Sequence, residues 1–109
     1  MTINYDEFKK VELKVGQILS AERIEGSDKL LKLSVNLGEE NPRQIIAGIG
    51  KAYAPEDIVD TQAIFVANLE PRALMGLESQ GMIVAGRDSE EKPVLVRPLQ
   101  ELTPGTELS

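Results

Sequence analysis

The sequence of 109 residues predicts a single all-β domain, built as a small barrel of five short strands with one short helix between the third and the fourth. Three observations predict it. Apolar and polar residues alternate with period two near the start, continuously apolar stretches closed by turn residues follow, and a proline with two acids interrupts the series. A chain of this length buries roughly two thirds of its unfolded surface without staples, so we expect one domain.

The first two strands are predicted from alternation. In "LLKLSVNLG" the apolar residues from Leu31 to Leu37 alternate with polar ones and end at Gly38, which is typical of a half-buried strand. Upstream, "ELKVGQILSAERI" alternates and then changes face around Gly16. This pattern predicts one long strand, bent at the glycine.

The remaining elements follow in order. The stretches "RQIIAGIG" and "QAIFVANL" predict strands closed by turn residues, and "GMIVAG" and "PVLVRP" predict two more. Between the two pairs, "KAYAPEDIVDT" places Pro55 at a first helical position with Glu56 and Asp57 in the first turn, so a short helix or a single turn is expected. "NYDEFKK" predicts another short helix, and "GRDSEEKP" a charged hairpin loop.

This order of elements is that of an OB-fold, a five-stranded Greek-key barrel that often binds nucleic acid or sugar on one face. We expect the barrel over residues 12–87 and a C-terminal extension over residues 88–109. The extension keeps apolar residues beyond the strands that a barrel needs: Val94, Leu95, Val96, Leu99, Leu102 and Leu108. Because such a tail must be covered, we expect a homodimer in which the extension is the dimerisation surface.

The composition argues against most classes of enzyme. The chain has no Cys and no His, so it lacks disulfides, thiolate nucleophiles and the commonest general base and metal ligand. The acids in "GEENPR" and "DSEEKP" lie in hairpin turns without a phosphate-binding partner, which disfavours an OB-fold pyrophosphatase. We therefore expect no catalysis, no metal and no cofactor. No apolar run approaches the roughly 18 residues of a membrane span, and no secretory signal is visible, which predicts a cytoplasmic protein without membrane association.

The net charge of -6 argues against a protein that coats nucleic acid in general, because phosphate affinity comes from clustered Lys and Arg. The excess acid, however, lies in residues 39–60 and 88–109. A compact site drawn from residues 23–32 and 68–82 could then be locally basic, although the overall charge repels a polyanion at long range. Such a site predicts weak, salt-sensitive binding.

Three blocks of sequence carry a closer resemblance. "DEFKKVELKVGQI", "EGSDKLLKLSVNLGEENPRQIIAGI" and "VANLEPRALMGLESQGMIVA" resemble the tRNA-binding domain family. That family includes the C-terminal domain of methionyl-tRNA synthetases and the free-standing tRNA-binding structure-specific protein. The resemblance implies an OB-fold, usually a homodimer in bacterial forms, that recognises the corner of folded tRNA and has no catalytic activity of its own. It implies tRNA as a partner, and leaves open whether a methionyl-tRNA synthetase catalytic domain is another.

The polar stretch "NLEPRALMGLESQGM" follows an apolar strand and bends at Pro71 and Gly76, so it is expected to be a presented loop. The resemblance gives the RNA-contacting positions to six residues: Lys29, Asn68, Arg72, Ser79, Gln80 and Met82. Their chemistry suits RNA, since the cations fit phosphates, the amides and the hydroxyl fit 2'-hydroxyls or base edges, and the methionine fits under an unstacked base. From the residues alone, Asn68 equally fits a turn cap, Ser79 a strand end and Met82 the core.

Two features modify this expectation. Many relatives carry basic residues where this chain has Ala73 and Met75, and a His-Pro pair where it has Ile24 and Glu25, so fewer phosphate contacts and a lower affinity are expected. The chain also has only four aromatic residues, which favours recognition of folded RNA over stacking of extended single strands. A dimeric peptide-binding chaperone on the same fold, as in a secretion-linked branch that resembles this family, is the alternative function.

Overall fold

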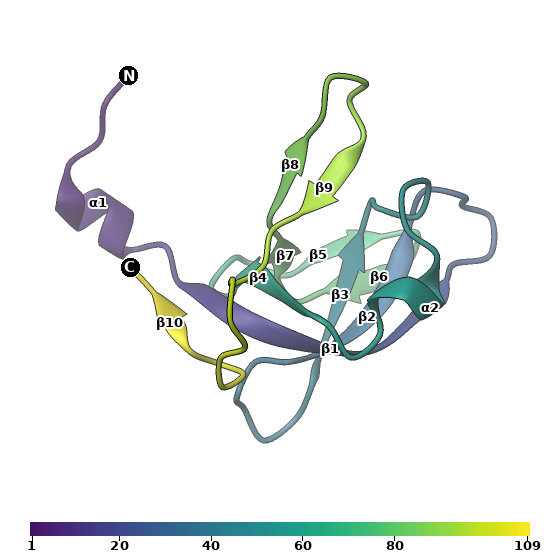
Figure 1. Cartoon of the computed structure of the whole chain (residues 1–109), viewed down its shortest axis with the longest axis horizontal. Helices are drawn as coiled ribbons and strands as arrows, with labels where there is room; N and C mark the ends of the chain where they lie inside the picture. The colour runs from purple at the N-terminus through teal and green to yellow at the C-terminus, as the bar shows by residue number, and fades with distance from the viewer.

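The computed structural model describes all residues 1–109 and is built mainly of short strands around one core (Figure 1). Its elements are α1 (Tyr5–Lys9), β1 (Leu13–Arg23), β2 (Leu31–Asn36), β3 (Arg43–Ala47), α2 (Pro55–Ile58), β4 (Gln62–Val66), β5 (Arg72–Leu74), β6 (Leu77–Ser79), β7 (Met82–Ile83), β8 (Ala85–Arg87), β9 (Pro93–Leu95) and β10 (Glu107–Leu108). The main sheet runs in the order β3-β2-β1-β4-β7, with β10 paired to the start of β1. The OB-fold prediction, with its helix between the third and fourth barrel strands, is confirmed.

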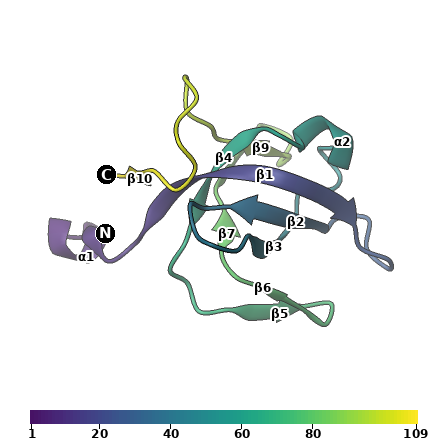
Figure 2. The ribbon, with the colours of Figure 1, turned by 90° about the horizontal axis from the view of Figure 1, so that it is seen from below.

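Strand β1 forms the centre of the sheet, as Figure 2 shows. Its first half pairs with β4 and its second half with β2, both antiparallel, so it belongs to both sides of the barrel. The predicted single long strand is confirmed, but the register shifts between Ile18 and Ser20 rather than at Gly16. Gly16 instead leaves room for the core, because a Cβ there would lie 2.6 Å from Cδ1 of Phe65.

The core confirms the alternation seen in the sequence. Every second residue of β2 is buried, beginning at Leu31, and the intervening residues are half-buried. Strands β3 and β4 bury several consecutive residues, as their continuous apolar stretches predict. Phe65 of β4 is fully buried, so its ring packs in the core and takes no part in any surface.

The barrel is closed between β3 and the segment leading into β7 largely by side chains. The backbone N–H of Gln80 donates to the carbonyl of Gln44 over 2.8 Å, and the N–H of Gln44 donates back to Oε1 of Gln80 over 3.0 Å. Two residues on, the N–H of Ile46 donates to Oγ of Ser79 over 3.0 Å. These contacts replace a regular backbone ladder along the closing edge.

The chain departs from the predicted elements in two places, whereas the predicted charged hairpin is present between β8 and β9. The stretch expected to be a loop, residues 68–82, contains the β5–β6 hairpin, and the stretch "GMIVAG" is divided into β7 and β8. Strands β8 and β9 flank the charged turn and stand out from the barrel (Figure 1). Both differences place polar segments above the barrel surface, where they form the walls of the site described below.

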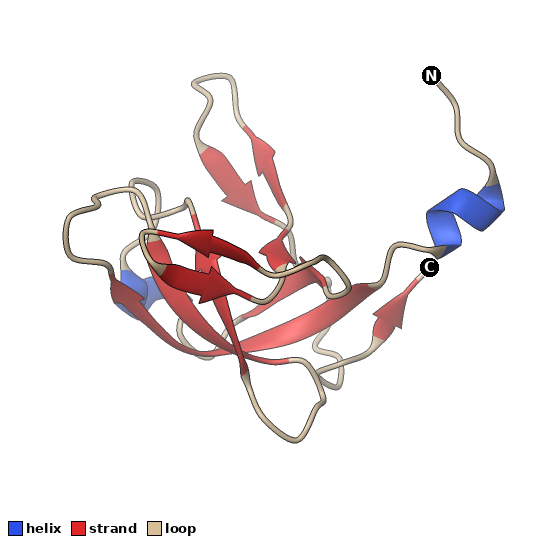
Figure 3. Cartoon of the chain, turned by 180° about the vertical axis from the view of Figure 1, so that it is seen from behind, coloured by secondary structure: helices blue, strands red, loops and turns tan.

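The two chain ends lie on the same side of the molecule, with the N-terminus at the tip of the tail that precedes α1 (Figure 3). Helix α1 begins at an N-cap, where the N–H of Glu7 donates to Oδ1 of Asn4 over 2.9 Å, and it buries none of its residues. In the C-terminal extension Leu95 packs on the core, and Leu108 pairs with Leu13. Neither α1 nor α2 is long and apolar enough to cross a membrane.

Candidate nucleic-acid interface

A groove of about 400 Å³ lies between β3, the β5–β6 hairpin and the β8–β9 hairpin. Its apolar lining comprises Leu30, Ile46, Ala47, Ile49, Leu69, Leu74, Met82, Ile83 and Ala85. Its charged residues are Lys29, Arg72 and Arg87, against the single acid Glu70. Three cations and one anion leave the groove locally positive in a chain whose net charge is -6, so it is suited to an anionic ligand.

Lys29 reaches the groove from the turn that precedes β2. The hydroxyl of Ser27 accepts the N–H groups of Lys29 and Leu30, over 3.3 and 3.1 Å, which fixes the shape of this turn. The side chain then passes close to Gly48, where a Cβ would lie 3.2 Å from Cε of Lys29. The ammonium group forms none of the protein's ion pairs and remains free to meet an anion.

Arg72 and Met82 reach the groove from β5 and β7. Arg72 is the first residue of β5, is exposed and has no ion-pair partner in the protein. Met82 begins β7 and is 47% exposed, so it belongs to the groove and not to the core. Its exposed thioether gives the groove an apolar surface within reach of two cations.

Asn68 lies outside the groove lining and holds the N-terminal segment in place. Its Oδ1 accepts the N–H of Glu12 over 2.8 Å, and its Nδ2 donates to the carbonyl of Lys10 over 2.5 Å. The amide therefore joins the end of β4 to the segment between α1 and β1.

Ser79 and Gln80 are the residues whose side chains close the barrel. Ser79 lines the groove but is only 2% exposed, and its hydroxyl also donates to the carbonyl of Gly81 over 3.0 Å. Gln80 is not among the lining residues, and its Oε1 is engaged with the backbone of Gln44. The structure thus places Lys29, Arg72, Ser79 and Met82 together and Asn68 and Gln80 beside them.

Sequence reasoning did not single out Arg87, which is the third cation of the groove. It ends β8, and one Nη1–H donates to the carbonyl of Glu91 over 3.1 Å. The carboxylate of Asp88 shapes the turn by accepting the N–H groups of Glu90 and Lys92, and these hydrogen bonds lower the pKa of Asp88. The only signal for Arg87 in the sequence was its position at the base of a predicted hairpin loop. An arginine at such a position usually points into solvent.

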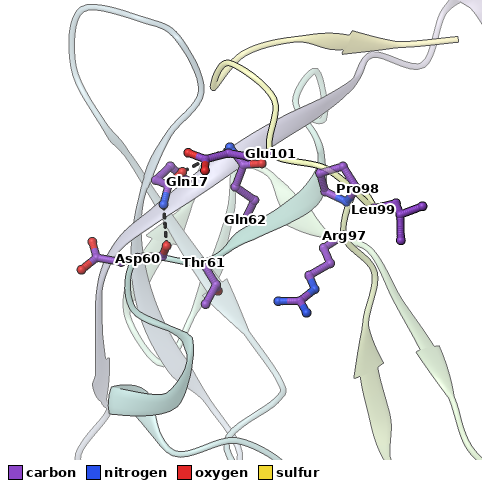
Figure 4. Close-up of a pocket in the computed structure, with 8 residues that line it drawn as sticks. All are labelled: Gln17, Asp60, Thr61, Gln62, Arg97, Pro98, Leu99 and Glu101. Carbon is purple, nitrogen blue, oxygen red and sulfur yellow. Dashed lines mark hydrogen bonds between the residues drawn. The ribbon is translucent and has the colours of Figure 1, made fainter.

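A second cavity, of about 330 Å³, lies where the C-terminal extension meets β1 and β4 (Figure 4). Its charges are mixed, with Asp60 and Glu101 against Arg97. The amide of Gln62 donates to the carbonyl of Leu102 over 2.5 Å and accepts its N–H over 3.0 Å, which ties the extension to β4. No group of three or more acidic side chains is placed to hold a metal ion anywhere in the chain.

The closed barrel, its inserted helix and its cationic groove define an OB-fold domain of the kind that presents one face to a ligand. Residues 13–107 match the family described as putative tRNA binding domain, and the chain belongs to that family. It is 50% identical to the methionine–tRNA ligase of Helicobacter pylori over 98% of this chain, and 45% identical to that of Methanococcoides burtonii over 95%. The chain spans only 16% and 15% of these two ligases.

Two solved structures have the same fold as this chain. The MetRS related protein from Pyrococcus horikoshii superimposes with a TM-score of 0.92 at 35% identity, over 100% of this chain and 99% of that one. The chaperone CsaA from Bacillus anthracis superimposes with a TM-score of 0.90 at 29% identity, over the full length of both chains. The same barrel therefore serves proteins that carry two different functional descriptions.

Proposed function

We propose that this chain is a cytoplasmic, non-catalytic module that binds tRNA by the folded shape of its elbow. It acts either as the C-terminal domain of a methionyl-tRNA synthetase, where it raises the effective concentration of tRNA at the catalytic domain, or as a free-standing homologue. The observation that carries the proposal is the groove, which is lined by three cations and the exposed Met82 in a chain of the tRNA-binding family.

The residues have distinct roles in this proposal. Lys29 and Arg72, joined by Arg87, neutralise phosphates at the edge of the groove, and Met82 supports a base or ribose. Ser79 and Gln80 hold the wall of the groove through the barrel closure, and Asn68 holds its neighbour, the N-terminal segment. Asn68 and Gln80 are exposed, and their remaining hydrogen-bonding capacity is available to 2'-hydroxyls, whereas the buried Ser79 acts only through the wall.

No aromatic side chain lines the groove, which supports recognition of shape. Proteins that bind extended single strands stack successive bases on aromatic platforms. We therefore predict that unlabelled folded tRNA competes for binding much better than poly-U of equal nucleotide concentration, in a fluorescence anisotropy assay with labelled tRNA. Equal competition by poly-U would contradict recognition of a folded shape.

Footprinting tests where on the tRNA the protein sits. Nuclease protection should be confined to the elbow and should recur in several unrelated tRNAs, because contacts to phosphates and 2'-hydroxyls carry little sequence information. Protection spread along the anticodon or acceptor arms would argue against an elbow-binding module.

The second candidate function is that of a dimeric peptide-binding chaperone of the secretion type. The likeness to the chaperone CsaA and the apolar lining of the groove favour it. The three cations of the groove favour RNA as the ligand, since they add no binding energy for an apolar peptide. Displacement of bound tRNA by an unfolded apolar polypeptide, at high salt as well as low, would favour the chaperone.

We also propose that the chain is a homodimer. The extension ties back to the barrel, yet Val94, Val96, Leu99 and Leu102 remain exposed, and α1 buries none of its own residues. Apolar side chains gathered in this way are typical of an interface. Light scattering at micromolar concentration should give about twice 11.9 kDa, whereas the monomer mass with a folded circular dichroism spectrum would remove this proposal.

A further inference from the structure

One guanidinium group holds both ends of the segment that carries Arg72. Arg43 is the first residue of β3, and its Nη1 donates to two backbone carbonyls, that of Ala67 and that of Gln80, the latter over 3.1 Å. Residues 68–79, including the β5–β6 hairpin, lie between these carbonyls in the sequence. Arg43 thus binds both ends of residues 68–79 to the barrel, and these two ends, at Ala67 and Gln80, are called the neck below.

Arg43 is itself fixed by Glu39. Its Nε donates to Oε1 of Glu39 over 2.8 Å and its Nη2 to Oε2 over 2.7 Å, in the two-pronged geometry that orients a guanidinium most strictly. Hydrogen bonding to Arg43 lowers the pKa of Glu39, and the same hydrogen bonds raise the pKa of Arg43. The arginine side chain is 25% exposed and does not line the groove. Four of its five N–H groups are committed to the protein, so it is a structural residue and not a phosphate contact.

Besides Arg43, four hydrogen bonds join residues 78–80 to β3, all of them at the β6 side of the hairpin. Strand β6 is joined to β3 by the Ser79 and Gln80 contacts and by one hydrogen bond of 2.9 Å from Nε2 of Gln44 to the carbonyl of Glu78. At the tip, only an apolar approach of Met75 to Gly26 is present. Lys29, by contrast, is held by a separate turn.

We propose that Arg43 is a positioning residue for RNA binding. By holding the carbonyls of Ala67 and Gln80 together, it sets where Arg72 stands relative to Lys29, and it strengthens tRNA binding without touching the RNA. Two cations meet a rigid pattern of phosphates well only when their separation is fixed beforehand. The inference rests on the proposed function of the groove.

The test compares Arg43→Met, Arg43→Lys and Arg72→Ala in tRNA titrations at several salt concentrations. Arg43→Met should weaken binding about tenfold, because two neck hydrogen bonds are lost, while the slope of log affinity against log salt stays that of the parent protein. Arg43→Lys keeps the positive charge but loses the planar guanidinium that binds Glu39 and both carbonyls at once, so it should show most of the same loss of affinity. Arg72→Ala should lower the slope by nearly one unit.

Hydrogen exchange supplies a readout that does not depend on RNA. In Arg43→Met the amides of Gln80 and Ile46, which form the closing edge, should exchange faster than in the parent, while those of β1 and β2 are unchanged. Thr61→Val is the matched control, since it removes the hydrogen bond of 2.6 Å from the Thr61 hydroxyl to the carbonyl of Ile58, outside the groove. It should leave tRNA affinity unchanged.

Each result decides the inference. A folded Arg43→Met protein with parental affinity overturns it, and so does a fall in salt slope equal to that of Arg72→Ala, which would make Arg43 a phosphate contact. If Arg43→Met fails to fold, Glu39→Ala removes both acceptors that orient the guanidinium and should weaken binding about threefold, and parental affinity there overturns the inference. Failure of the parent protein to bind tRNA sinks the proposed function instead, and the exchange result still reports on the neck.

Discussion

Replacing Lys29 and Arg72 together by Ala should lower the affinity for folded tRNA by roughly two orders of magnitude and reduce the salt slope by somewhat less than two units. Both cations line the groove, and neither is occupied by an ion pair within the protein, so their charge is available to phosphates. The loss should be similar for every tRNA, because phosphate contacts position the ligand and carry no sequence information. Filter binding across a salt series measures both quantities.

A matched control separates this effect from the overall charge. Glu56 is exposed on α2 and does not line the groove, so Glu56→Ala changes only the weak long-range repulsion between the acidic chain and the RNA. That change should vanish above about 0.15 M salt, where charges beyond roughly 8 Å are screened. A folded Lys29→Ala, Arg72→Ala protein that binds with the parental affinity and slope would leave the two residues as bystanders on a solvated surface.

Gly16→Ala should destabilise the barrel by about 3 kcal/mol, a large share of the roughly 5–15 kcal/mol that holds a domain together. A Cβ at this position would lie 2.6 Å from Cδ1 of Phe65 and 2.7 Å from Cγ1 of Val35. Both neighbours are fully buried on the strands that flank β1, so neither ring nor methyl group has free space to move into. Urea denaturation followed by circular dichroism gives the change.

Gly86→Ala serves as the comparison, because a Cβ there meets nothing within 4 Å. Its midpoint of denaturation should differ little from that of the parent. Adding Phe65→Leu to Gly16→Ala should recover part of the lost stability if the ring is the obstacle. A Gly16→Ala protein with the parental midpoint would mean that β1 moves aside at little cost.

The parts of the fold with a strict period were predictable from the sequence. The alternation from Leu31 to Leu37 predicted a strand with one buried face, since successive side chains of a strand point to opposite sides. The helix at Pro55 was predictable because proline fixes the backbone at a helix start, and the two acids that follow favour the positive end of the helix dipole.

The β5–β6 hairpin was not predictable in the same way. Its strands have three residues each and show no apolar alternation, and its turn consists of Met75 and Gly76, both with positive φ, at 52° and 77°. Glycine is typical of such a two-residue turn, but methionine seldom adopts this conformation. The sequence therefore read as a loop bent at a glycine.

For the site, residue chemistry indicated the correct segments but could not assign partners to side chains. An amide or a hydroxyl suits RNA and backbone groups equally well, and only the fold shows that Asn68 meets Lys10 and Glu12 or that Ser79 meets Ile46. Arg87 shows the opposite case, since the pairing of β8 with β9 brings a residue of a charged turn to the groove. The contacts of all these residues with RNA remain predictions.

The hydrogen bonds of Arg43 to the two carbonyls at the neck also bear on how the domain can be redesigned. Gly76, at the tip of the hairpin, has nothing within 4 Å of the position of a Cβ, so residues added at this turn would meet no neighbouring atoms, while its φ of 77° favours keeping a glycine there. The barrel and the tip of the hairpin can then be redesigned separately. A designer who keeps the neck intact could graft new tips onto the same frame and so redirect it to other ligands.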